Sequence, residues 1–231
     1  MTENDLLRAE ALEAGYGRLA VVHDFDLVVA PGTVTAILGA NGAGKTTVIL
    51  TLAGVLEPLG GTIYWKGEAV RSPLHRRVRA GLAFVPEQRS VFMNLTVAQN
   101  LRLGQGPAAR ALEIFPELEP HLGRKAGLLS GGQQQLLTLA RCLASEPALL
   151  MIDEVSLGLA PLVVKRLLAA IREATARGTA VVLVEQHIKQ ALAIADYAVV
   201  LRRGRRVLEG PAAHVRHSER EIQAAYMPAG E

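Results

Sequence analysis

A glycine-rich segment early in the chain has the residue types that bind phosphate groups. Its residues are Gly39, Ala40, Asn41, Gly42, Ala43, Gly44, Lys45 and Thr46, which match the pattern of a phosphate-binding loop. Glycines let the backbone curl until several N–H groups point at one phosphate chain. We expect the Lys45 ammonium to reach the β- and γ-phosphates and the Thr46 hydroxyl to hold Mg²⁺. The segment therefore predicts a nucleoside triphosphate site.

The residues on either side of this segment favour a phosphate site over an ordinary glycine-rich turn. Residues 33–38 form a β-branched, apolar run of strand length, and residues 46–55 read as a mostly apolar helix. A strand, a loop and a helix in this order are the context in which phosphate-binding loops occur. The helix also directs the positive end of its dipole toward the anion.

A second group of chemically active residues follows an apolar strand pattern over 148–152. This strand ends in two carboxylates, Asp153 and Glu154, which would lie at the carboxyl edge of a parallel sheet, where α/β proteins bind ligands. We expect Asp153 to hold Mg²⁺, directly or through water, and Glu154 to orient and deprotonate an attacking water. Exposed acids at a strand exit are the alternative, and the phosphate loop favours the catalytic interpretation.

The elements that must position these residues form a layered α/β pattern. Apolar strand-like runs alternate with helical stretches, which predicts a P-loop NTPase core with a parallel sheet. An alternating pattern up to residue 31, together with 61–65, predicts a small N-terminal antiparallel sheet. We expect one domain over 1–231, with a helical subdomain inserted at about 87–146. The expected core strands are 33–38, 82–85, 148–152 and 179–184. We expect one helix over 162–176, a second helix from the end of the last of these strands to about residue 195, and a hairpin turn at Gly204.

Composition excludes several classes of protein. Of the 231 residues 50% are hydrophobic and 20% are charged, which fits a globular chain rather than a disordered one. Aromatic residues make up only 4% and the net charge is +3, from scattered arginines, so we expect no nucleic-acid partner. The lone Cys142 excludes an internal disulfide and is expected to be an inert core thiol. The first residues are acidic and 18 consecutive apolar residues do not occur, so we expect no secretion signal and a membrane to be reached only through a partner.

The segment Leu129-Ser130-Gly131-Gly132-Gln133 precedes an expected helix and resembles the signature motif of ABC-type ATPases. With 39–47 and 151–154 in this order, the whole chain resembles an ABC nucleotide-binding domain. In that family two domains bind two ATP molecules head to tail, each between one subunit's phosphate loop and the other's signature motif. The resemblance therefore assigns nucleotide contacts to Thr47, Ser130, Gly131, Gly132 and Gln133. By itself the segment could be an ordinary helix cap.

The resemblance also matches Tyr16 to the aromatic residue that stacks on adenine, although a core tyrosine is the alternative. Residues 85–87, 156–161 and 183–186 are similar to the LivF type of subunit in branched-chain amino-acid importers. This implies that Glu87 binds Mg²⁺ and that Gln186 donates a hydrogen bond to the γ-phosphate. Gln88 and His187 lie beside these positions, and a shift of one residue would give them the two roles. Val155 replaces the proline that usually follows the catalytic glutamate, which predicts a less rigid loop.

The resemblance implies an ATP-hydrolysing importer subunit at the cytoplasmic face of the inner membrane. Its partners would be a second ATPase subunit, two permease subunits and, indirectly, a solute-binding protein. Importers of urea or amides, a soluble ATPase of the iron–sulfur assembly kind and a nucleotide sensor without hydrolysis are the alternatives. Six apolar residues could line a groove for a permease helix, although we expect most of them to belong to the core: Phe92, Leu95, Val97, Leu101, Leu103 and Phe115.

Overall fold

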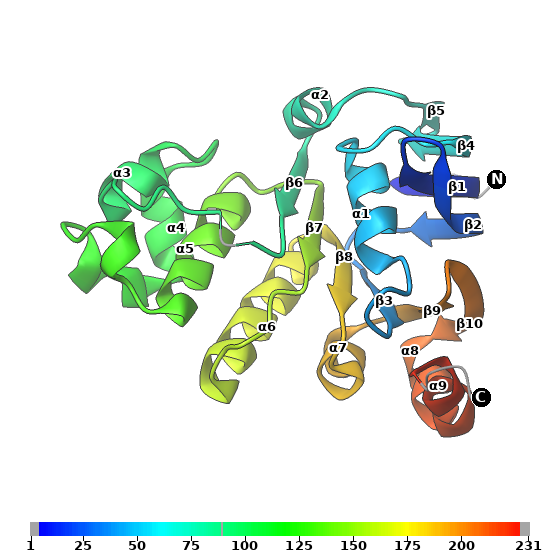
Figure 1. The fold of residues 1–231 in the computed structure, drawn as a ribbon. Coiled ribbons are helices and arrows are strands. Elements are labelled where there is room, and N and C mark those ends of the chain that lie inside the picture. The colour runs from blue at the N-terminus through cyan, green and yellow to red at the C-terminus, as the bar shows by residue number, and fades with distance from the viewer. Residues whose placement is uncertain (1–4, 89, 227–231) are drawn as a thin grey trace.

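Two β-sheets organise the chain in the computed structural model, which describes residues 5–88 and 90–226 (Figure 1). The larger sheet has the strand order β10-β9-β3-β8-β7-β6, and all its neighbouring strands pair in parallel except β10, which is antiparallel to β9. Its strands are β3 Val34–Gly39, β6 Leu82–Val85, β7 Leu149–Asp153, β8 Ala180–Glu185, β9 Tyr197–Arg202 and β10 Arg205–Pro211. The predicted α/β class with a parallel core is confirmed.

The smaller sheet is antiparallel, as the N-terminal pattern predicts, with the order β2-β1-β4-β5. Helix α1, Lys45–Ala53, lies between the two sheets (Figure 1) and packs into a core cluster that contains residues of both. This position explains why α1 is apolar nearly all round its surface. The strands of this sheet are β1 Leu7–Tyr16, β2 Leu19–Val29, β4 Gly60–Trp65 and β5 Glu68–Ala69.

The residues between β6 and β7 form helices to one side of the large sheet (Figure 1). They are α3 Val97–Arg102, α4 Ala108–Ile114, the 3₁₀ helices η1 Pro116–His121 and η2 Ala126–Leu128, and α5 Gly131–Leu143. The expectation of mostly helical structure from residue 87 is wrong for the described residues that precede α3, 87, 88 and 90–96, since α3 begins at Val97. The cause is the buried Asn100, whose amide accepts from Phe92 N at 2.9 Å and donates to the carbonyl oxygens of Phe92, Leu95 and Thr96. The division of the chain at about 87 and 146 stays a prediction.

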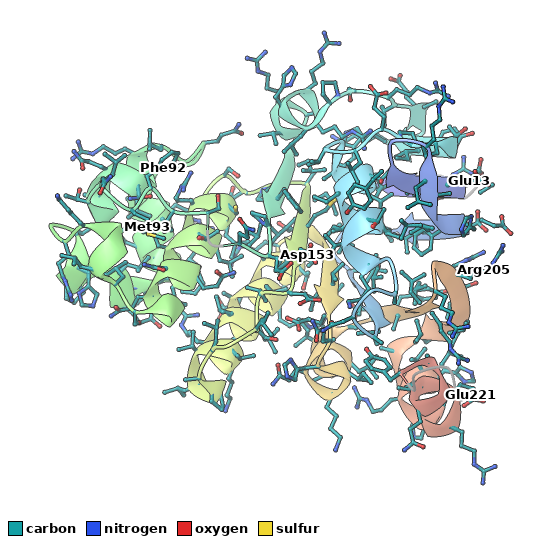
Figure 2. All side chains as sticks on the ribbon, in the orientation of Figure 1. Glu13, Phe92, Met93, Asp153, Arg205 and Glu221 are labelled. Atoms are coloured by element: carbon teal, nitrogen blue, oxygen red, sulfur yellow. The ribbon has the colours of Figure 1, made fainter. Side chains whose placement is uncertain are left out.

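The six apolar residues considered for a permease groove differ in their burial. Val97, Leu101 and Phe115 are buried in the core, Leu95 is half-buried, and Phe92 and Leu103 are about half exposed at 51% and 52%. Figure 2 shows Phe92 on this helical part, with Asp153 near the centre of the molecule. The expectation of core residues is therefore confirmed for Val97, Leu101 and Phe115, and the groove interpretation stays a prediction for Phe92 and Leu103.

Helices α2 Leu74–Arg79, α6 Pro161–Ala176, α7 Ile188–Ile194, α8 Ala212–His217 and α9 Glu219–Tyr226 complete the fold. The expected hairpin is present between β9 and β10. Its turn residues Arg203 and Gly204 have φ values of 51° and 74°, the left-handed pair of a tight hairpin turn. Gly204 N donates to Ala43 O at 2.9 Å, and its carbonyl accepts from His23 N at 2.9 Å. The hairpin is thereby anchored to the phosphate loop.

Candidate nucleotide site

A cavity of about 510 Å³ opens beside the phosphate loop, at the carboxyl ends of the central parallel strands. Strand ends of this kind meet at one edge of an α/β sheet, which is where such folds bind ligands. The lining comes from the end of β1 and the start of β2, the phosphate loop with the start of α1, and the segments that follow β6, β7 and β8. It comprises Tyr16, Val21, Asn41, Gly42, Gly44, Lys45, Thr46, Thr47, Glu87, Glu154, Leu157 and Gln186.

The phosphate loop has the backbone geometry that its glycines predict. Gly42 and Gly44 have φ values of 76° and 103°, which residues with a Cβ adopt at a cost. A Cβ on Gly44 would also lie 2.9 Å from a methyl carbon of Val22. Gly44 is the N-cap of α1 and no side chain caps the helix. The first N–H groups of α1 are therefore free of a capping side chain and suited to an anion.

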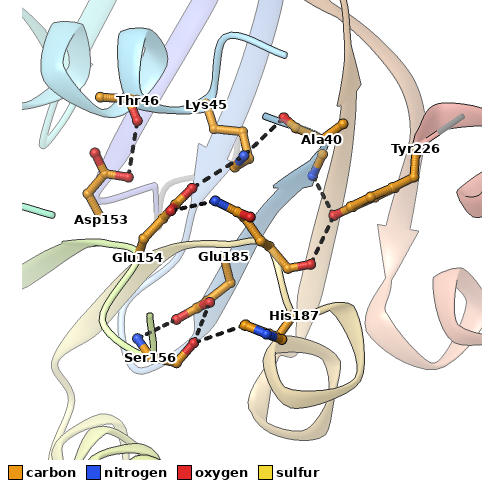
Figure 3. Close-up of polar contacts among 11 residues, drawn as sticks. Ala40, Lys45, Thr46, Asp153, Glu154, Ser156, Glu185, His187 and Tyr226 are labelled. Carbon is orange, nitrogen blue, oxygen red and sulfur yellow. Dashed lines mark hydrogen bonds and ion pairs between the residues drawn. The ribbon is translucent and has the colours of Figure 1, made fainter. Parts of the chain in front are cut away.

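A buried polar network joins three of the expected catalytic residues (Figure 3). The Lys45 Nζ lies 3.4 Å from Glu154 Oε1 and donates to Ala40 O at 3.1 Å. The Gln186 Nε2 donates to Glu154 Oε2 at 2.7 Å. Glu154 has a φ of 50°, and its N–H donates to Val184 O at 3.0 Å. The backbone thus turns sharply after β7 and directs the carboxylate at the phosphate loop.

Asp153 and Thr46 form the second polar contact of the site, with Thr46 Oγ1 donating to Asp153 Oδ1 at 3.4 Å. Burial raises the pKa of Asp153 to about 6; the bond from Thr46 opposes this, and the charges of Glu154 and Glu87 add to it. A buried carboxylate, a hydroxyl and the nearby Glu87 are the hard oxygen donors that Mg²⁺ prefers. The described residues contain no cluster of three or more acidic, histidine or cysteine ligands.

Ser156, Glu185 and His187 form a network that sequence reasoning missed. The buried Glu185 accepts from Ser156 N at 3.1 Å and from Ser156 Oγ at 2.8 Å, and His187 Nδ1 lies 3.4 Å from the same hydroxyl oxygen. Burial raises the pKa of Glu185, although the bonds from Ser156 oppose this. The position of Glu185, a charged residue at the end of an apolar strand, was the one feature of the sequence that could have indicated this network. Val155, which stands where a proline usually follows the catalytic glutamate, is buried. Its burial and the bonds of Ser156 anchor the start of the loop over 156–161.

The structure brings some of the predicted site residues together and leaves others apart. Gln186 lines the cavity, whereas His187 faces Ser156 and is absent from the lining, as is Gln88. Tyr16 is 51% exposed beside the phosphate loop, which excludes the core alternative. Gly39, the last residue of β3, precedes the loop.

The segment 130–133 does not reach the cavity. Ser130 is the N-cap of α5 and forms a capping box with Gln133: Ser130 Oγ accepts from Gln133 N at 3.3 Å, and Gln133 Oε1 accepts from Ser130 N at 2.9 Å. The segment therefore presents a helix N-terminus on the helical part of the chain. Its role in a nucleotide site stays a prediction and requires a second molecule.

Comparison with known proteins agrees with this fold. A family model described as ABC transporter matches residues 22–156. The chain therefore belongs to the ABC transporter family; it is an ATP-binding subunit of that family and an ATPase. Among the described residues no helix is long and apolar enough to cross a membrane.

Individual relatives cover nearly the whole chain. A high-affinity branched-chain amino acid transport ATP-binding protein, BraG of Pseudomonas aeruginosa, is 39% identical over 88% of this chain and 91% of its own length. A probable branched-chain amino acid transport ATP-binding protein, LivF of Archaeoglobus fulgidus, is 34% identical over 90% of this chain and 92% of its own length. The lipopolysaccharide export ATP-binding protein LptB of Acidithiobacillus ferridurans is 33% identical over 90% of both chains. Among solved structures, a nucleotide-free ATP-binding cassette from an ABC transporter has a TM-score of 0.86 at 24% identity, covering 98% of this chain and 100% of its own.

Proposed function

We propose that this chain is the ATP-hydrolysing subunit of a branched-chain amino-acid importer. It would bind peripherally at the cytoplasmic face of the membrane, with a second ATPase subunit, two permease subunits and, indirectly, a solute-binding protein. The named functions of the 39% and 34% identical relatives support the substrate class. The LptB relative makes lipopolysaccharide export the second candidate. The arrangement of Lys45, Glu154 and Gln186 around one cavity is the observation that supports hydrolysis.

The network suggests how each residue acts. The loop N–H groups and Lys45 hold the phosphates of ATP, and Tyr16, exposed at the cavity edge, stacks on the base. Glu154 is a carboxylate fixed by Gln186, and it orients the attacking water and accepts its proton. Thr46, Asp153 and Glu87 would hold Mg²⁺, which supplies charge neutralisation at the phosphates when it is bound.

The position of Ser130 and its neighbours supports a dimer of ATPase subunits. The segment 130–133 carries the nucleotide contacts that the family resemblance assigns, yet it lies outside the cavity of its own chain. A second ATPase subunit would supply the same helix N-terminus to close the cavity over the γ-phosphate.

A second cavity supports docking of a permease helix. It measures about 420 Å³ and lies between α2 with β6 on one side and α5 with the end of α3 on the other. Apolar side chains line much of it, including Leu74, Val78, Phe84 and Leu103. The Arg141 guanidinium at its edge donates to Ser90 O at 2.9 Å and stacks over the Phe92 ring at 5.3 Å.

The segment after β6 connects this groove with the nucleotide site. Glu87 lines the nucleotide cavity, and Pro86 and Ser90 line the groove. A short amphipathic permease helix seated between α2 and α5 would therefore contact the segment that carries a proposed Mg²⁺ ligand. This continuity is the basis for coupling hydrolysis to movement of the permease.

Purification of the complex tests the proposal. The chain is purified from detergent-solubilised membranes, and the co-purifying chains are identified by mass spectrometry. We expect two polytopic membrane proteins and a second ATPase. Leu103→Asp in the groove should lose the membrane proteins, whereas Leu128→Asp, on an exposed residue outside the groove, should retain them. Soluble partners alone would contradict the importer and favour a soluble ATPase.

A further inference from the structure

The side chain of Tyr226 reaches the nucleotide site from the C-terminal end of the described chain (Figure 3). It is the last residue of α9, a helix that contacts β9 and β10. Its hydroxyl oxygen accepts a hydrogen bond from Gly39 N at 2.8 Å. The same hydroxyl donates to Gln186 O at 3.5 Å, the weaker of the two contacts. One oxygen atom therefore connects the end of β3, where the phosphate loop begins, with the segment after β8.

Both hydrogen-bond partners of this hydroxyl are close to the proposed catalytic residues: Gly39 begins the phosphate loop, and Gln186 contacts Glu154. Gly39 is the last residue of β3, and a Cβ at this position would lie 2.5 Å from Leu201 O, so the backbone is closely packed there. Gln186 directs its side-chain amide to Glu154 at 2.7 Å. A change in the position of the Gln186 carbonyl moves the base of that side chain, because the carbonyl and the Cβ share one Cα.

The protonation state of the hydroxyl suits both contacts. Burial raises the pKa of Tyr226 to about 12; the bond from Gly39 opposes this, and the charges of Glu185 and Glu154 add to it. The phenol therefore keeps its proton at neutral pH and can accept from Gly39 N while it donates to Gln186 O.

We propose that Tyr226 is a positioning residue for ATP hydrolysis, which fixes the Gln186 backbone relative to the phosphate loop and thereby holds the Gln186 amide against Glu154. The C-terminal helix α9 then forms part of the catalytic arrangement rather than only covering the sheet. The inference rests on the proposed roles of Glu154 and Gln186. It places the effect on turnover, since the hydroxyl contacts the loop at Gly39, the last residue of β3, and not at the N–H groups that begin α1.

The test is Tyr226→Phe in the full chain, which removes the hydroxyl and keeps the ring. Loss of one positioning hydrogen bond should lower kcat about tenfold and leave the KM for ATP within about twofold. Tyr64→Phe is the matched control, because the Tyr64 ring in β4 stacks under Arg8 at 4.3 Å and Phe keeps that contact. An unchanged kcat in Tyr226→Phe, or a raised KM with unchanged kcat, would overturn the proposal.

A double-variant cycle separates positioning from a general structural role. In a Gln186→Ala background the amide that Tyr226 is proposed to hold is gone, so Tyr226→Phe should cause no further fall in kcat. An equal fall in both backgrounds would show that Tyr226 acts elsewhere and would contradict the inference. Glu154→Gln is measured in parallel: if it retained full activity, the assigned role of Glu154 would fail, a result distinct from the behaviour of Tyr226.

Discussion

The pair formed by Lys45 and Glu154 yields a prediction about stability as well as activity. Both side chains are buried, and their charged atoms lie 3.4 Å apart. Glu154→Gln keeps the size of the side chain and its contact with Gln186, but it leaves the Lys45 ammonium without its carboxylate. Removing one partner of a buried ion pair is strongly destabilising, because the other charge stays desolvated.

The magnitude follows from the distance. At an effective dielectric constant of about 20, charges at 3.4 Å attract each other by about 5 kcal/mol. The substitution also removes the repulsion between the carboxylates of Glu154 and Asp153. This repulsion helps to raise the pKa of Asp153. We therefore expect a net loss of about 3 kcal/mol in the free energy of unfolding, or about 6–12 °C in Tm for a chain of this size.

The assay is thermal unfolding with and without ATP, beside a steady-state ATPase measurement. The phosphates of ATP would supply the negative charge that Lys45 has lost, so ATP should raise the Tm of Glu154→Gln by more than that of the parent, while hydrolysis is lost. Glu173→Gln, on an exposed carboxylate of α6, should change neither quantity. A nucleotide-free Tm equal to that of the parent, with an equal ATP shift, would refute the reasoning.

Two further predictions concern titratable groups outside the catalytic network. Burial raises the pKa of Cys142 from 9.0 to about 11, so at about pH 8 its thiolate fraction should be about 100-fold lower than that of an unshifted thiol. Because a more basic thiolate is also more nucleophilic, its rate with a thiol reagent should be about tenfold lower and should rise with pH; a rate like that of a free thiol would contradict this. Burial also raises the pKa of Glu185, so the stability contributed by its protonation is present at low pH and lost as pH rises through that pKa. Glu185→Gln, which cannot ionise, should therefore gain stability relative to the parent in denaturant unfolding as pH rises above the ordinary glutamate pKa, and a difference independent of pH would argue against a shifted carboxylate.

The strands and the phosphate loop were predictable because their signals are local. The runs at 33–38 and 148–152 differ by one residue at each end from β3 and β7. The helix expected over 46–55 ends earlier, at Ala53, because Gly54 adopts a φ of 80° and closes it. Residues 87, 88 and 90–96 read as helical but form no helix, and the buried amide of Asn100 bonds to the backbone N–H and carbonyl of Phe92 instead.

The contacts around the site could be predicted only in part. The order of the motifs placed Lys45 and Glu154 near each other, but the bond from Gln186 to Glu154 depends on the relative register of β7 and β8. The contact of Tyr226 with Gly39 joins residues 187 positions apart, and no local pattern indicates it. Exposure at Leu103 and burial at Leu101 likewise follow from how α3 packs, which spacing alone does not define.

Transport by the purified complex, reconstituted into vesicles, tests the central claim most directly. Uptake of labelled leucine, isoleucine and valine is measured with ATP supplied on the side of this subunit, for the parent and for Glu154→Gln. We predict uptake of these amino acids that requires ATP and is lost in the variant. A complex that hydrolyses ATP but moves none of the three, or that moves them equally well with Glu154→Gln, would contradict the account.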